Sequence, residues 1–276
     1  MIHTVSTQRL VRTFPAVTRA SDPFGRYSPM DKYEIRAPDV TGQSYVEQVK
    51  RTRQMLRSMT LENALEVIEF RHDLDFFEAI ASAKREGKLI VSNDIHDRIL
   101  TETKDRQFYK SLVLTGTLII YEAPDKQFGK EVNFGWENNS NLKYSISFQV
   151  PKQFQGKVNC ALVVEHPDFE LLDLGKNRYQ IRAADGIHLI EHFPKRDGWY
   201  IPDAETKIPQ GEPVKESKEA RRLLRLGSCY LGSVGRDNDV YYDRWRDVYA
   251  CVSWSFVSGA AFIGLGEAAP EKSDSK

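Results

Sequence analysis

Residues 142–150, LKYSISFQV, alternate apolar and polar side chains with a period of two. The apolar positions are Leu142, Tyr144, Ile146, Phe148 and Val150. Because successive side chains of a strand point to opposite faces, this alternation predicts a β-strand with one buried face and one solvated face. The stretch therefore sets the structural class that we expect for the second half of the chain.

Segments on both sides of this stretch have similar strand-like patterns and are separated by proline, glycine and other turn residues. They comprise residues 112–122, 157–165, 168–174, 178–183, 187–193, 247–259 and 260–266, the last two of which we expect to pair with each other. Strands at this spacing favour an antiparallel sandwich or barrel over a doubly wound sheet. We predict an antiparallel β domain over residues 108–266, with a short helix near residues 217–226.

Helical signals precede the β domain. Ser44 and Glu47 form a capping-box pattern that opens a helix to about Met59. A second segment runs from Thr60 to Gly87, either as one helix or as two pieces separated at Asp73 and Asp75. A third helix is expected to begin at Asp94. These patterns predict a small helical segment over residues 44–107 and, with the β domain, an α+β fold.

The two ends of the chain lack such periodicity. Residues 1–43 hold four prolines among four aromatic residues, which favours an extended arm that packs on its own domain or on a neighbouring subunit. The arm is also rich in arginine, serine and threonine, so a transit peptide is a second interpretation. Residues 267–276 are expected to form a disordered tail.

The charge of the chain is balanced overall but not locally. Lys plus Arg and Asp plus Glu each number 39, so no net field attracts the whole molecule to a polyanion. Residues 1–60 nevertheless hold ten basic and five acidic groups, a net charge of +5, and four of the basic groups are Lys50, Arg51, Arg53 and Arg57. This basic N-terminal region is compatible with nucleic-acid binding, although pairing with the acidic segment after residue 60 is the alternative that we favour.

The cysteine pattern favours a reducing compartment. Cys160, Cys229 and Cys251 are widely spaced and form no CxxC pair. No stretch approaches the roughly 18 apolar residues of a membrane span, and the N-terminus has no apolar signal region. We therefore expect a cytoplasmic protein without a membrane partner.

One short motif has the spacing of a zinc site. His188, Glu191 and His192 match the pattern HxxEH, in which two imidazoles hold the metal and the glutamate activates a water molecule. With Gly186 before it and Phe193 after it, the motif resembles that of the pitrilysin-like metallopeptidases. The resemblance covers about eight residues, and it implies zinc as a cofactor with a third ligand some seventy residues downstream, where Glu267 lies.

The surroundings of the motif favour a different interpretation. Asp185-Gly186 and Pro194 enclose a short window within a region of strands, whereas a zinc-binding helix needs more turns. In a strand, His188 and His192 would lie on one face about 13 Å apart and would not share a metal. We therefore expect a strand here, without a cofactor, and keep a zinc-dependent hydrolase as the alternative function.

The remaining candidate residues are aromatic or paired with histidine. Trp199 and Trp245 lie in polar surroundings, which makes them candidate contact residues. The doublets His72-Asp73 and His96-Asp97 are expected to occupy exposed helix faces. Taken with the arm and the β domain, these features favour a non-catalytic binding or assembly protein, either a structural subunit or an adaptor that contacts protein partners.

Overall fold

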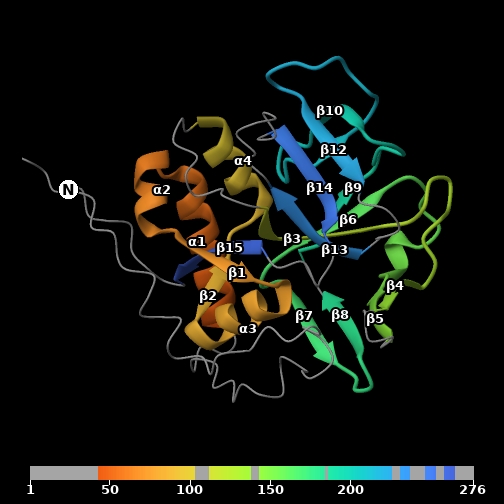
Figure 1. Ribbon diagram of the computed structural model, residues 1–276, viewed down its shortest axis with the longest axis horizontal. Helices are drawn as coiled ribbons and strands as arrows, with labels where there is room; N and C mark the ends of the chain where they lie inside the picture. The colour runs from red at the N-terminus through yellow and green to blue at the C-terminus, as the bar shows by residue number, and fades with distance from the viewer. Residues whose placement is uncertain are drawn as a thin grey trace, which may run out of the picture.

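The computed structural model describes residues 43–102, 112–137, 143–183, 186–225, 231–236, 246–252 and 258–264. It confirms a mixed α+β fold with a mostly antiparallel, barrel-like sheet. The helices lie on one side of the molecule and most strands on the other (Figure 1). The helices of the described part are α1 (Gln43–Ser58), α2 (Leu61–Val67), α3 (Phe76–Glu86), α4 (Asn93–Glu102) and a 3-10 turn, η2 (Lys152–Phe154).

The larger sheet has eleven strands, eight of which form a continuous path. In spatial order the path is β1 (Glu69–Leu74), β15 (Ser258–Gly264), β3 (Val113–Tyr121), β13 (Leu231–Arg236), β14 (Asp247–Val252), β12 (Arg221–Arg225), β10 (Gly198–Pro202) and β11 (Pro209–Gln210). Three strands join it from the side: β2 (Lys88–Ile90) pairs with β15, β6 (Ala161–Glu165) with β3, and β9 (His188–Ile190) with β6. The β12–β14 and β15–β3 pairs are parallel and the others antiparallel.

The smaller sheet contains the alternating stretch of residues 142–150 as its strand β5. Its order is β4 (Glu131–Glu137), β5 (Lys143–Gln149), β8 (Arg178–Ala183) and β7 (Phe169–Asp173). Tyr144, Ile146 and Phe148 of β5 are buried, while Lys143 and Gln149 are exposed. The predicted alternation of this strand is therefore confirmed.

Helix α3 joins the two sheets in one apolar core. The Phe76 ring lies 6.3 Å from that of Phe169 on β7, and the Phe77 ring lies 5.1 Å from that of Tyr179 on β8. The helix begins at a capping box in which the Asp75 carboxylate accepts from the Glu78 amide while the Glu78 side chain accepts from the Asp75 amide. The cap fixes where the two buried phenylalanines enter the core.

Three details of the expected fold are wrong. Residues 221–225 of the predicted short helix near 217–226 form strand β12, because pairing with β14 and β10 overrides the local helical propensity. The second segment is divided near Asp73 and Asp75, as one of the two alternatives had it, but a strand that was not expected, β1, separates α2 from α3. Strand β15 pairs with β1, β2 and β3, not with β14 as expected.

The strands β1 and β2 show that the helical segment belongs to the same sheet as the C-terminal strands. Both pair with β15, which lies more than 170 residues further along the chain. The close packing around β2 requires a glycine on β3, because a Cβ at Gly116 would lie 2.2 Å from the Ile90 carbonyl oxygen. No helix within the described ranges is long and apolar enough to cross a membrane.

Candidate functional site

The HxxEH residues do not form a helical turn. His188 begins strand β9, which ends at Ile190, and Glu191 and His192 lie in the following turn with exposed side chains. The strand interpretation is therefore confirmed for residues 188–190, while the strand is shorter than the predicted segment 187–193. Glu191 and His192 consequently leave the face of the sheet on which His188 lies.

Two carboxylates flank the His188 ring from opposite edges. Its Nε2 lies 3.4 Å from an Asp203 oxygen and its Nδ1 lies 3.4 Å from a Glu205 oxygen. Because the two nitrogens of an imidazole point away from each other, these carboxylates do not share a metal position with it. The described residues hold no group of three or more His, Cys, Asp or Glu side chains suited to a metal ion, and Glu267 lies outside them.

The predicted basic cluster is divided between two environments on α1. Lys50 and Arg51 are exposed, whereas Arg53 and Arg57 pair with carboxylates of distant elements. Arg53 donates to Asp168 at 2.8 Å and to the carbonyl oxygens of Glu165 and His166. Half of the cluster is therefore occupied by contacts that hold α1 to the β6–β7 connection, and not by the acidic segment after residue 60 that we expected.

Arg57 is the centre of the second set of contacts. Its Nε donates to Asp94 at 2.8 Å and its Nη2 to Glu165 at 3.3 Å. Burial raises the pKa of Glu165, the Asp94 carboxylate adds to the effect, and Arg53 and Arg57 offset it only in part. The two arginines face three carboxylates, those of Asp94, Glu165 and Asp168, which disfavours an anion at this position.

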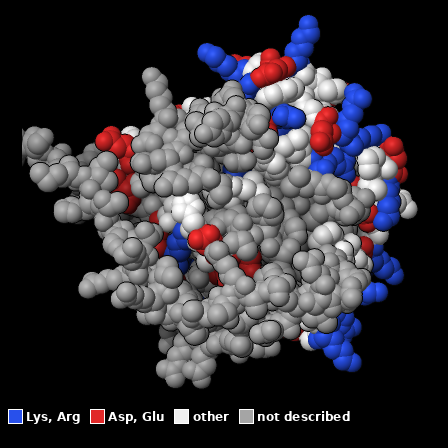
Figure 2. All heavy atoms as spheres, viewed as in Figure 1, with Lys and Arg blue, Asp and Glu red and all other residues white. Residues whose placement is uncertain are grey.

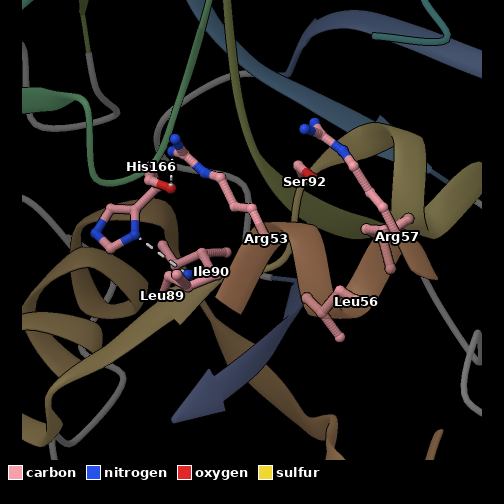
Figure 3. Close-up of a pocket in the computed structure, with 8 residues that line it drawn as sticks. Arg53, Leu56, Arg57, Leu89, Ile90, Ser92 and His166 are labelled. Carbon is pink, nitrogen blue, oxygen red and sulfur yellow. Dashed lines mark hydrogen bonds between the residues drawn. The ribbon is translucent and has the colours of Figure 1, made fainter. Parts of the chain in front are cut away.

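A small cavity lies beneath the two arginines. Figure 3 shows Ser92 between the two guanidinium groups, with Ile90 and His166 on the side of Arg53. The space open to a water-sized sphere is about 10 Å³, which corresponds to a single water molecule. Burial and the nearby Arg53 lower the pKa of His166 to about 3, and its neutral Nδ1 accepts from the Ile90 amide at 3.2 Å.

Trp199 lies on β10, near the end of the larger sheet, and Trp245 lies outside the described residues. The Arg246 guanidinium lies 4.5 Å from the centre of the Trp199 ring, a cation–π contact. Arg246 also donates to the Ser217 carbonyl oxygen at 2.8 Å and pairs with Glu216. These contacts hold the segment 213–217 against β10.

Apolar side chains are exposed beside Trp199. Ile201 follows it on β10 and is 48 % exposed, and Val214 is 37 % exposed. The Val214 amide donates to the Trp199 carbonyl oxygen at 2.8 Å, so the two segments run alongside each other. We call Trp199, Ile201 and Val214 the Trp199 edge.

The His96-Asp97 doublet is buried, and the expectation of an exposed helix face is wrong for it. Asp97 accepts from Arg221 at 2.6 and 2.9 Å and from Arg236 at 2.9 Å, and Arg236 is fully buried. Burial alone would raise the pKa of Asp97, but Arg236 and Arg221 outweigh it and lower the pKa below its ordinary value. His72-Asp73 is exposed as expected, although His72 lies in β1 and not in a helix.

Comparisons of the chain with models of protein families, curated proteins and solved structures found no match. The assignment of a function therefore depends on the geometry of the described residues.

Two groups of residues were missed by the sequence patterns. The first is the buried set Asp97, Arg221 and Arg236, in which Asp97 is more than a hundred residues from both arginines, so no local signal links it to them. The second is the exposed pair Ile201 and Val214. Both are apolar residues in the polar stretch 195–216. Single apolar residues also occur in ordinary loops, so the sequence pattern did not mark these two as candidate contact residues.

Proposed function

We propose that the protein is a non-catalytic binding or assembly protein that contacts a protein partner through the Trp199 edge. The observation that carries this proposal is the exposure of Ile201 and Val214 on either side of a tryptophan covered by an arginine. Tryptophan and arginine are enriched among the residues that dominate binding energy in protein interfaces. Neighbouring apolar side chains exclude water from such a contact.

The Trp199 edge is fixed before any partner arrives. The Arg246 contacts and the hydrogen bond from Val214 hold both segments in place, so binding orders few additional side chains. Pro209 and Pro213 lie in the outermost segment and cannot donate backbone hydrogen bonds. The proposed contact is therefore made by side chains and not by strand addition.

Self-association is the first form of this contact to test. We expect the purified protein to form an oligomer in sedimentation experiments and the variant Ile201→Glu to dissociate at least ten-fold more readily, because it places a charge in an apolar contact. Val158→Glu is the matched control, since Val158 is 42 % exposed and lies at an isolated bridge with Gln127, not on β10. A protein that stays monomeric at every concentration, or equal effects of both variants, would contradict assembly through this edge.

A further inference from the structure

The β7–β8 hairpin projects from the smaller sheet. Its end lies at the lower margin of the molecule, beyond the body of the two sheets (Figure 1). The Leu174 amide donates to the Arg178 carbonyl oxygen at 2.8 Å, which closes the hairpin. The three residues between them, Gly175, Lys176 and Asn177, all have positive φ values of 74°, 55° and 58°. A turn of this kind is tight, so the end of the hairpin has a defined shape.

One face of this end carries a group of apolar and basic side chains. Tyr179 and Ile181 of β8 point into the core, so Arg178 lies on the outer face. Ser145 of β5 is paired with Arg178 in a parallel register, and Lys143, two residues before Ser145, lies on the same outer face. Leu174 is 45 % exposed, and Lys176 extends from the turn. We call this group the basic tip: Lys143, Leu172, Leu174, Lys176 and Arg178.

The charges of the basic tip are not neutralised by the rest of the described chain. Lys143, Lys176 and Arg178 make no ion pair there. Two carboxylates of β7 are otherwise placed: Asp173 accepts from the Gly175 amide at 2.7 Å, and Glu170 lies opposite Arg182. On the other side of the tip, Glu137 of β4 occupies the position opposite Lys143. Lys and Arg atoms are also prominent at this margin in the view coloured by charge (Figure 2). The tip therefore presents three positive charges around an exposed leucine.

We propose that the basic tip binds an acidic segment of a protein partner, in which an apolar side chain covers Leu174. The identification of the partner as a protein rests on the function proposed above. Complementary charge steers such a segment to the tip, and the leucine supplies the desolvated contact that charge alone does not provide.

The neighbouring surface favours a polypeptide over a nucleic acid. The outer positions of β5 and β8 beyond the tip are hydroxyl, amide and guanidinium groups, among them Ser145, Ser147 and Gln180. Single-stranded nucleic acids bind sheet faces by stacking bases on aromatic rings, and these two strands have none on that face. Serine and amide side chains instead suit the alternating donors and acceptors of a peptide backbone.

Fluorescence anisotropy with labelled synthetic probes tests the proposal on the full chain. The probes are a glutamate-rich peptide with interspersed leucines, a peptide of equal charge with serines in their place, a single-stranded oligonucleotide and vesicles containing phosphatidylserine. We expect the leucine-containing peptide to bind most tightly and the variant Lys176→Glu/Arg178→Glu to weaken it about ten-fold. Leu174→Ser is expected to lower its affinity to that of the serine peptide.

Lys152→Glu/Lys157→Glu is the control, because it makes the same change of charge at the opposite end of β5, where η2 follows the strand. Equal weakening by this control would show that only net charge matters and would overturn the proposal. So would the absence of peptide binding, or tighter binding of the oligonucleotide or the vesicles. The Trp199 edge is tested by a separate measurement, the loss of oligomers in Ile201→Glu. The failure of one proposal can therefore be recognised independently of the other proposal.

Discussion

The protein uses arginine in opposite ways at two places in the fold. Between α4 and the larger sheet, Arg221 and Arg236 are buried and share one carboxylate, that of Asp97. At the basic tip, Arg178 and two lysines are exposed and without a carboxylate partner in the described chain. The comparison shows that the position of the counter-ion, and not the residue type, separates a charge that holds the fold together from a charge that is available to a partner.

The largest effect is expected when the shared carboxylate is removed. Asp97→Ala leaves two buried guanidinium groups without their common partner, which should lower the free energy of unfolding by about 3–5 kcal/mol. Urea unfolding followed by circular dichroism measures this change. Asp125→Ala is the control, because Asp125 forms an exposed pair with Lys195 and its removal should have little effect on stability. Similar midpoints for the two variants would refute the role of the buried network.

Acid should destabilise the protein through His96 and His166, the two buried histidines of the described ranges. Burial, with Arg236 nearby, lowers the pKa of His96 to about 3, as burial and Arg53 do for His166. Each is neutral in the folded protein and protonates near pH 6.5 when unfolded. The contribution of the two histidines to the free energy of unfolding is therefore full above pH 6.5. It is lost as pH falls towards 3, by about 1.4 kcal/mol per pH unit for each histidine.

The buried carboxyl group of Asp75 gives the free energy of unfolding the opposite dependence on pH, and a substitution at this residue tests its contribution. Burial, together with Glu78, raises the pKa of Asp75 to about 7, so in the folded state it holds a proton that the unfolded chain releases near pH 4. Its contribution to stability is full below pH 4 and is lost as pH rises towards 7. In Asp75→Asn, the free energy of unfolding should therefore rise more steeply with pH between pH 4 and 7, by about 1.4 kcal/mol per pH unit. Urea unfolding measured across that range tests this change. An unchanged dependence of the free energy of unfolding on pH would contradict a buried, protonated Asp75.

Much of the fold could be predicted from local patterns, but its ionic contacts could not. The alternation in residues 142–150 identified β5, Gly87 identified the end of α3 and Asp94 the start of α4, because these signals lie within a few residues of one another. Strand β12 was mistaken for a helix because RRLLR is short and its strand partners are distant in sequence. The pairing of Arg53 with Asp168 links residues 115 positions apart, which no periodicity reveals. Exposed apolar positions such as Leu174 become visible only once the face of each strand is known.

The smallest effects distinguish the two halves of the basic cluster on α1. Arg57→Ala should lower the free energy of unfolding by about 1 kcal/mol, because its pairs with Asp94 and Glu165 are partly solvated. Lys50→Ala and Arg51→Ala should change it by less than about 0.5 kcal/mol, since both side chains are exposed on the helix. Urea unfolding of the three variants at low and high salt measures the difference, and only the Arg57 effect should shrink as salt screens its pairs. Three equal effects would mean that the ion pairs do not hold α1 in place, and that its buried Val49 and Leu56 suffice.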